Sequence, residues 1–290
     1  MNLVDLHTHT TESDGTLSPE ELVRAAAKAG VRTLAITDHD TMEADAAAVA
    51  AASTFGLELI RGIELTSKHP TGNVHLLGYF FNGGPKGDFA AWLDRLLEGR
   101  RDRNRRLALR LQELGLDVSV EEAERYGRRL TGRPHFARVL VAKGYVRTIR
   151  EAFDRYIGES GDAYVERESP GVSEAIHRIT AAGGVVSLAH PARIVVRDSD
   201  QEAATVAEFG AAGLGAIEAF HSDHDEAATR HYQALADKLG LAVSGGSDFH
   251  GANKPGVEIG SGVNGNLRVP EWVVPALRAR SHKSIRYEAS

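Results

Sequence analysis

The segment VDLHTHTTESDGTLSPEELVRAAAKAG, residues 4–30, carries the strand-to-helix transition that points to the fold. Its first residues form a short apolar run, which is typical of a buried strand ending near His7. Ser18, Pro19 and Glu21 form a capping box with proline at the first helical position, so a helix is predicted to begin here. Two histidines and an aspartate lie between the two elements, where neither element requires them.

The same alternation of strand and helix continues along the chain. Further strands are predicted at residues 33–40, 57–66, 73–80, 185–191, 216–221 and 242–250, and further helices at 43–55, 172–182 and 225–239. Strands that alternate with helices favour a parallel sheet or a (β/α) barrel.

A helical, arginine-rich segment interrupts this alternation. Linker-like stretches flank it, FNGGPKGD at 81–88 and GESGD at 158–162. Three parts are therefore expected: a first barrel part at 1–85, an insertion at 86–159 and a second barrel part at 160–290. Residues 95–155 contain fifteen Arg and one Lys against nine Asp or Glu, a local charge of +7 in a chain whose net charge is −6.

The composition limits the class of protein. With 290 residues, of which 42% are hydrophobic, the chain can form one large domain or a domain with an insertion. It has no cysteine, which excludes disulfides and a thiolate nucleophile. The sequence shows no secretory signal and no run of about 20 apolar residues. We therefore expect a cytoplasmic protein that does not contact membranes, and no protein partner is evident.

Residues that can bind metals recur at the predicted strand ends. They are His7 and His9 after the first strand, Asp38 and His39 on the second, Glu64 on the third, His75 in the fourth, and His190, His221, Asp248 and His250 on the later ones. In a (β/α) barrel the C-terminal strand ends converge on one face, so these residues should meet there, with Asp14 on a loop crossing that face. The histidines on loops or helix faces are expected to be ordinary: His69, His177, His224, His231 and His282.

Imidazole and carboxylate ligands without thiolate suit Zn, Mn or Fe. The candidates exceed the needs of one ion, so two or three divalent ions are predicted, with a carboxylate such as Glu64 bridging two of them. Clustered divalent ions polarise phosphoryl oxygens, lower the pKa of bound water and stabilise the leaving oxygen. The pattern therefore indicates hydrolysis of phosphoesters.

Several segments resemble the successive motifs of the PHP family, named for polymerase and histidinol phosphatase. They are DLHTHTTESDGTLSPEELVRAAAKAGVRTLAITDHDT (5–41), GIELT (62–66), VHLLGY (74–79), GGVVSLAHPAR (183–193) and GGSDFHG (245–251). The resemblance implies an α/β fold, a distorted seven-stranded (β/α) barrel of PHP type with a helical insertion, and a trinuclear metal centre, with Mn favoured over Zn or Fe.

Carried over by motif, the resemblance assigns ligands to each ion. His7, His9, Glu64 and Asp248 would hold one ion, Glu64, His75 and His190 a second, and Asp14, His39 and His250 a third. Many family members have His where Asp14 stands. Asp38 would orient a histidine.

Within the family, the insertion, the TGRPHFA segment (131–137) and Arg193 resemble the branch of nucleoside 3',5'-bisphosphate phosphatases and a related RNA 5'-end exonuclease. A second phosphate on the substrate needs cationic groups away from the ions, and Arg binds phosphate through two nitrogens. The candidates are Arg133, His135 and Arg193, with His221 as a weaker one. The other arginines at 100–110 are expected to form a solvated helix face.

The expected activity is removal of the 3'-phosphate from nucleoside 3',5'-bisphosphates, with a metal-bound hydroxide and no protein side chain as nucleophile. The alternative is hydrolysis of phosphodiesters at the 5' ends of RNA or short oligonucleotides. Two other classes are an amidohydrolase, which also uses a His-x-His barrel site, and a PHP barrel that binds metals only for structure.

Overall fold

The computed structural model describes residues 3–127 and 130–284, the last three as backbone only. The chain divides into two compact units: the first contains residues up to Ala90 and from Pro170, and the second is Ala91–Ser169. The predicted insertion, 86–159, ends earlier than the second unit does, because Ala163 and Val165 pack in the core of the second unit.

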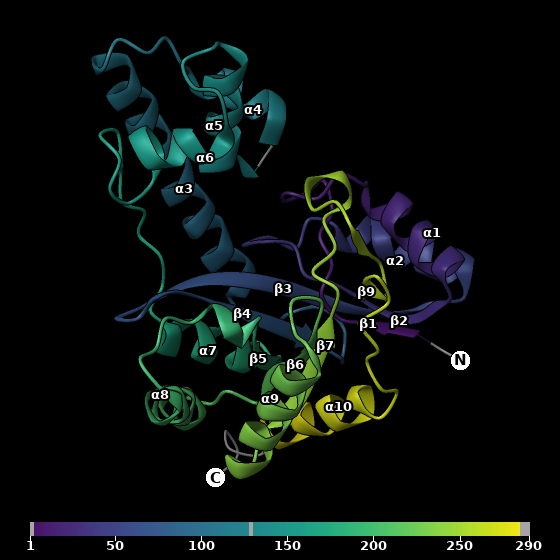
Figure 1. The fold of residues 1–290 in the computed structure, drawn as a ribbon. Helices are drawn as coiled ribbons and strands as arrows, with labels where there is room; N and C mark the ends of the chain where they lie inside the picture. Colours follow the sequence, from purple (N-terminus) through teal and green to yellow (C-terminus); the bar gives the residue numbers. More distant parts are fainter. Residues whose placement is uncertain (1–2, 128–129, 285–290) are drawn as a thin grey trace. The chain divides into compact units, whose positions relative to one another are not determined.

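The first unit is built on one seven-stranded sheet of order β1-β2-β3-β4-β5-β6-β7 (Figure 1). Its strands are β1 Leu3–Asp5, β2 Val31–Ile36, β3 Glu58–His69, β4 Gly72–Phe80, β5 Val185–Leu188, β6 Ala216–His221 and β7 Ala242–Gly246, and a short pair is formed by β8 Val257–Glu258 and β9 Gly262–Val263. Its helices are α1 Pro19–Ala29, α2 Asp45–Phe55, α7 Val172–Ala181, α8 Ser199–Ala211, α9 Glu226–Lys238 and α10 Val273–Ser284. The predicted alternation of strands and helices is thus confirmed, while α8 and α10 were not predicted.

One strand runs against the others, which corrects the expectation of a wholly parallel sheet. β4 pairs antiparallel with both β3 and β5, whereas the remaining neighbours are parallel. The reason is the tight turn between His69 and Gly72, which returns the chain directly along β3. As a result, the beginning of β4 lies at the rim where the parallel strands end.

The segment that follows β1 is hydrogen-bonded to β7 and to the residues after it. The Leu6 N–H donates to the Gly245 carbonyl at 3.1 Å, and the His9 N–H donates to the Phe249 carbonyl at 2.9 Å. The sheet therefore curves back on itself as a distorted barrel.

The Asp5 carboxylate reinforces this closure. It is fully buried and accepts hydrogen bonds from the Ser247 N–H (2.8 Å), the Ser247 hydroxyl (2.6 Å) and the Gly260 N–H (2.7 Å). Burial raises the pKa of Asp5, although these donors act in the opposite direction. One side chain thus ties β1 to the segment after β7 and to the loop that follows it.

We expect Asp5→Ala to lower the free energy of unfolding by about 3–5 kcal/mol, since it leaves several buried donors without an acceptor at about 1–3 kcal/mol each. Urea unfolding in the presence of a chelator measures this without a contribution from metal. Asp88→Ala is the matched control, because the Asp88 side chain is 73% exposed and its ion pair with Arg178 should contribute little. A loss below about 1 kcal/mol for Asp5→Ala would contradict the assigned role.

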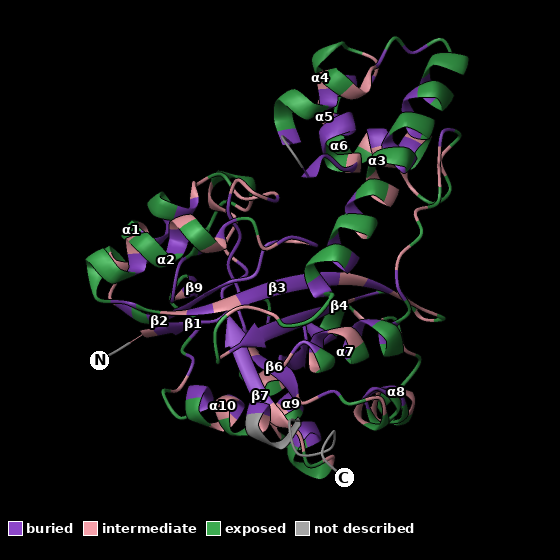
Figure 2. Ribbon diagram, turned by 180° about the vertical axis from the view of Figure 1, so that it is seen from behind, coloured by how far each residue is buried: buried purple, intermediate pink, exposed green. Residues whose placement is uncertain are grey.

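Helices cover the outside of the barrel with their apolar faces turned inward, so that buried residues line the sheet and exposed ones the outer helix faces (Figure 2). The predicted capping box is confirmed: the Glu21 N–H donates to the Ser18 hydroxyl at 3.2 Å, and the Ser18 N–H donates to the Glu21 carboxylate at 2.8 Å. Leu22, Val23 and further residues of α1 pack with α2 and β2 in one core cluster.

The second unit is helical and has its own core. Its elements are α3 Phe89–Glu113, which begins at the unit boundary, α4 Val120–Gly127, α5 Arg133–Ala142, α6 Ile149–Ala152 and a π-helical turn, Phe153–Ile157. Leu107, Leu111, Phe136 and Leu140 are among the residues that form the core. Among the described residues, no helix combines the length and apolarity that crossing a bilayer requires.

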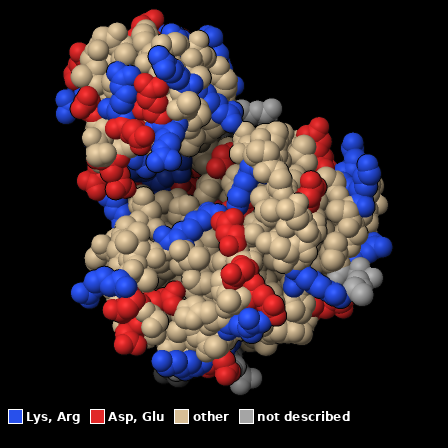
Figure 3. All heavy atoms as spheres, in the orientation of Figure 1, with Lys and Arg blue, Asp and Glu red and all other residues tan. Residues whose placement is uncertain are grey.

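The arginines of α3 are only partly a solvated face. Arg101, Arg105, Arg106 and Arg110 are exposed and form ion pairs with nearby acidic residues of the same helix, as expected. On the face of the molecule drawn in Figure 3, basic and acidic side chains are accordingly interspersed. Arg103 differs, because it is only 5% exposed and lies in an arginine cluster inside the unit.

Candidate metal centre

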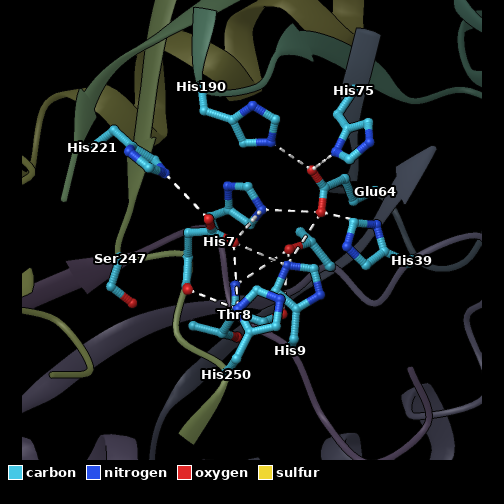
Figure 4. Close-up of polar contacts among 12 residues, drawn as sticks. His7, Thr8, His9, His39, Glu64, His75, His190, His221, Ser247 and His250 are labelled. Carbon is cyan, nitrogen blue, oxygen red and sulfur yellow. Dashed lines mark hydrogen bonds and ion pairs between the residues drawn. The ribbon is translucent and has the colours of Figure 1, made fainter. Parts of the chain in front are cut away.

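The predicted ligands of the first unit meet at the rim where the parallel strands end (Figure 4). His75 joins them from the beginning of β4, where it pairs with Thr66 of β3. Backbone geometry at this rim is unusual: His190 has φ 26° and Asp248 has φ 55°, in the left-handed region that few non-glycine residues occupy. Such conformations cluster at functional sites, because the surrounding structure must hold them in place.

Glu64 lies at the centre of the cluster and is fully buried. Its Oε1 contacts two rings, His75 Nδ1 at 2.8 Å and His190 Nε2 at 3.0 Å. Its Oε2 faces three others: His7 Nε2 at 3.3 Å, His9 Nε2 at 3.2 Å and His39 Nδ1 at 3.2 Å. Each oxygen of this carboxylate therefore faces a different set of histidines, which is the arrangement expected of a bridging ligand.

The two oxygens of Asp248 also have different surroundings. Oδ1 faces His7 Nε2 (3.5 Å) and His9 Nε2 (3.4 Å), inside the cluster. Oδ2 faces two cations, Arg193 at 3.1 Å and Lys254 at 2.8 Å. The side chain is thus held so that one oxygen remains directed at the histidines.

Asp14 completes a third, more open group. Its Oδ1 lies 3.3 Å from His250 Nε2 and 3.6 Å from His9 Nδ1, and its Oδ2 lies 3.7 Å from His39 Nε2. The Asp14 side chain is 36% exposed, in contrast to Glu64. This group is the part of the cluster nearest to solvent.

These donors fit divalent cations. Several buried ring nitrogens that face Glu64 have no hydrogen-bond partner among the described residues, namely His7 Nε2, His9 Nε2 and His39 Nδ1, and neither has Glu64 Oε2. Buried polar atoms without partners are costly unless an ion or water satisfies them. Ligand atoms close enough to share an ion are offered by four groups: His7, His9, Glu64 and Asp248; His9, Asp14, His39 and His250; His39, Glu64 and His75; and His7, Glu218 and His221.

The ionised carboxylate of Glu64 favours cations, whereas the rings around it differ in protonation. Burial opposes the charge of Glu64, but the rings of His39, His7 and His75 outweigh it and hold the pKa of Glu64 well below its usual range. Burial lowers the pKa of His39 and of His190 to about 4 despite the nearby carboxylate, so both rings are neutral at pH 7. For His9 burial acts in the same direction, yet Asp248 and Glu64 raise its pKa to about 10. An arriving ion would therefore displace a proton from His9.

Asp38 has contacts other than those expected of it. Its carboxylate accepts hydrogen bonds from the Thr10 N–H (2.7 Å), the Thr10 hydroxyl (2.6 Å) and the Ser13 hydroxyl (2.5 Å), rather than from a histidine ring. Ser13 in turn lies 3.5 Å from His9 Nδ1. Asp38 thus fixes the loop that carries Asp14, because this loop turns back over the end of β2.

The candidate substrate residues are found in both units. In the first unit Arg193 contacts Asp223 and Asp248 and lines a cavity of about 150 Å³ together with Asn73, His75 and His190. His221 is 1% exposed, and its Nε2 lies 3.5 Å from Asp248 Oδ2, so it supports a predicted ligand in this structure.

In the second unit, Arg133 and His135 lie at the beginning of α5. The Arg133 guanidinium lies over the rings of Phe153 and Tyr164. The His135 Nδ1 accepts a hydrogen bond from the Gly132 N–H at 2.9 Å and so caps the helix.

The sequence analysis missed Glu218, which contacts His7 and His190 from the middle of β6. A single acidic residue inside the strand segment AIEAFH looks like a solvent-facing position when only alternation is considered. The one available signal was its spacing, three residues before the predicted site residue His221.

A barrel whose rim gathers histidines and carboxylates around a buried glutamate is typical of metal-dependent hydrolases. The sequence profile of the PHP domain matches residues 5–209, and the chain belongs to this family. It is 32% identical to the 3',5'-nucleoside bisphosphate phosphatase of Chromobacterium violaceum, over 89% of this chain and 90% of the relative. It is 34% identical to a 5'-3' exoribonuclease of Haemophilus influenzae, over 85% of this chain and 89% of the relative.

A solved structure agrees with this assignment. A protein of Bifidobacterium adolescentis, assigned by prediction as a metal-dependent phosphoesterase, superimposes with a TM-score of 0.80 at 30% identity, covering 96% of both chains. The protein is accordingly a metal-dependent phosphoesterase of the PHP family.

Proposed function

We propose that this phosphoesterase removes the 3'-phosphate of nucleoside 3',5'-bisphosphates and releases a 5'-nucleotide and phosphate. The observation that carries the proposal is the set of overlapping ligand groups around Glu64, in a chain similar over 89% of its length to a nucleoside bisphosphate phosphatase. Two to three ions, of which Mn suits imidazole and carboxylate ligands well, are proposed to occupy these groups.

The ligand sets are proposed as the sequence predicted them. His7, His9, Glu64 and Asp248 hold the first ion, Glu64, His75 and His190 the second, and Asp14, His39 and His250 the third. Bound divalent ions supply Lewis-acid polarisation of the phosphoryl group and a more acidic water. The chain itself contributes the geometry: Glu64 holds two ligand sets together, and the cations on Asp248 Oδ2 keep its other oxygen directed at the cluster.

A second phosphate on the substrate is supported by the arginine cluster of the second unit. Burial, together with the neighbouring charges of Arg100, Arg133 and Arg167, lowers the pKa of Arg103 to about 9, which leaves it protonated at pH 7. Guanidinium groups bind phosphate through two nitrogens at once, so such a cluster is suited to holding a substrate phosphate. We propose Arg133 as the substrate contact of this cluster.

Hydrolysis of phosphodiesters at RNA 5' ends is the second candidate function. It is favoured by the 34% identity to an exoribonuclease and by the basic character of residues 95–155. An exonuclease that contacts several phosphates should lose affinity steeply as salt rises, whereas a phosphatase that holds one nucleotide should not. Measuring kcat/KM against salt concentration on short 5'-phosphorylated RNA and on 3',5'-bisphosphates separates the two.

For the wild-type protein we expect a nucleoside 3'-monophosphate to be a poorer substrate than the 3',5'-bisphosphate by about one to two orders of magnitude in kcat/KM. A charge-assisted hydrogen bond to a remote phosphate contributes roughly 1.5–3 kcal/mol to positioning the reacting group. Arg133→Ala should narrow this difference by impairing only the bisphosphate reaction, and Arg133→Lys should restore it in part.

The control is Arg110→Ala, because Arg110 is exposed on α3 and pairs with Glu113. Arg193→Ala, predicted from sequence to act like Arg133→Ala, is a less selective probe because Arg193 also contacts Asp248. Equal kcat/KM for the two substrates in the wild type would reject the bisphosphate proposal in favour of a phosphatase of broad specificity.

A further inference from the structure

Glu218 is a buried carboxylate with two separate tasks at the rim of the barrel. It lies in the middle of β6 and is 0% exposed. Its Oε1 lies 2.9 Å from His7 Nδ1, and its Oε2 accepts a hydrogen bond from the His190 N–H at 2.7 Å. His7 and His190 belong to the ligand sets of two different ions in the proposed centre.

At His7 the contact determines which ring nitrogen can bind a metal. An ionised carboxylate only accepts hydrogen bonds, so Nδ1 must carry a hydrogen when it faces Glu218. The lone pair of the neutral ring is then on Nε2, which lies 3.3 Å from Glu64 Oε2 and 3.5 Å from Asp248 Oδ1. Glu218 therefore directs the metal-binding nitrogen of His7 into the cluster.

At His190 the contact holds the backbone. The φ angle of 26° is unfavourable for a residue with a Cβ and persists only where the surroundings enforce it. The hydrogen bond from the His190 N–H to Glu218 supplies such a constraint, and the ring then reaches Glu64 Oε1 at 3.0 Å through Nε2. Loss of this hydrogen bond would let the His190 backbone relax and move the His190 ring away from Glu64.

We propose that Glu218 is a positioning residue that couples the first and second ion sites, since one carboxylate sets the ring of His7 and the backbone of His190. The inference rests on the proposed metal centre and concerns how its ligands are prepared. His7, Glu218 and His221 are also close enough to hold an ion themselves. The contacts oppose that role, because both Glu218 oxygens are engaged. His221 Nδ1 accepts the Asp223 N–H at 3.0 Å, so the neutral ring carries its hydrogen on Nε2 and has no free lone pair for an ion.

The test measures metal binding by the full chain rather than catalysis. Glu218→Gln has only one acceptor oxygen, so its amide N–H₂ must face either the His7 N–H or the His190 N–H. Partners that orient metal ligands typically contribute 10–100-fold to affinity. We expect Mn²⁺ affinity, measured by calorimetric titration of metal-free protein, to fall by about that factor at more than one site.

Ser187→Ala is the matched control, because it removes a buried hydrogen bond inside the same barrel, to the Ser244 hydroxyl at 2.7 Å, without contacting the cluster. It should bind Mn²⁺ like the wild type. Glu218→Asp retains the charge but withdraws the carboxylate by one methylene, and it should have intermediate affinity.

A spectroscopic measurement separates positioning from general destabilisation. In Zn²⁺-loaded protein labelled with ¹⁵N-histidine, the His7 Nδ1–H bonded to Glu218 should give a strongly downfield proton signal. This signal should shift or vanish in Glu218→Gln and persist in Ser187→Ala. Wild-type affinity and an unchanged signal in folded Glu218→Gln or Glu218→Asp would overturn the proposal.

The number of ions bound at saturation distinguishes a metal ligand from a positioning residue. Loss of one ion at saturating Mn²⁺ in Glu218→Gln, without weaker binding of the others, would make Glu218 a ligand and overturn its positioning role. Because no substrate is used, failure of the bisphosphate proposal would leave these measurements unaffected.

Discussion

Glu64→Gln should lower kcat/KM by about three orders of magnitude, the largest loss expected from a single substitution in this protein. The carboxylate faces five histidines through its two oxygens, and an amide would present N–H₂ to one of the two sets. Removing a bridging ligand weakens the binding of two ions at once, and bound ions contribute several kcal/mol of charge stabilisation to the transition state. Each 1.36 kcal/mol of that stabilisation that is lost lowers the rate about tenfold.

Asp14→Asn is the comparison, because Asp14 is assigned to one ion at the exposed side of the cluster. We expect kcat/KM of Asp14→Asn to fall by about tenfold to a hundredfold, the size typical when a single partner at a metal site is removed. The measurement is steady-state kcat/KM for both variants at saturating Mn²⁺, with circular dichroism to verify folding. Comparable values for the two would contradict the bridging role of Glu64.

Removing the metal should abolish phosphatase activity and also lower the melting temperature. Ions present at about a hundredfold above their Kd stabilise a protein by about 2.7 kcal/mol per site. Two to three such sites amount to about 5–8 kcal/mol, so at roughly 2–4 °C per kcal/mol for a domain of this size, chelation should lower Tm by roughly 10–30 °C. Adding Mn²⁺ back should restore both activity and Tm.

Elemental analysis completes this prediction, with two to three divalent ions expected per chain in the active protein. The reason is the number of overlapping donor groups, which exceeds the needs of one ion. Full activity with one ion or none, or after dialysis against chelator, would contradict the proposed centre.

The sequence alone predicted that the candidate ligands meet, because each parallel strand ends in residues that a barrel brings together. His7 and His9 after β1, and Asp248 and His250 after β7, are distant in sequence and meet because these two strands close the sheet. Their convergence could be predicted because hydrophobic runs mark the strands, and the C-terminal ends of the strands of a barrel lie on one face.

The features that the sequence did not predict depend on the direction of a strand and on which of its faces is buried. Hydrophobic patterning cannot show whether a strand runs parallel or antiparallel, so the reversal of β4 was not predicted. It also cannot show which side of a strand is covered, so Glu218 and the buried Arg103 were overlooked. Helix α8 is capped by Asp198, whose Oδ1 accepts the Gln201 N–H, and has acidic residues in its first turn, a signal that was present but not used.

The interruption of the barrel between β4 and β5 determines the order in which the chain can mature during translation. Strand β4 ends at Phe80 and its partner β5 begins at Val185, so at about 5–20 residues per second the ribosome needs roughly 5–20 s between them. The second unit, Ala91–Ser169, is completed in that interval. The ligands His7, His9 and Glu64 are synthesised well before Asp248, with which they form one ligand group. The complete ligand group of His7, His9, Glu64 and Asp248 can therefore assemble only after Asp248 has left the ribosome.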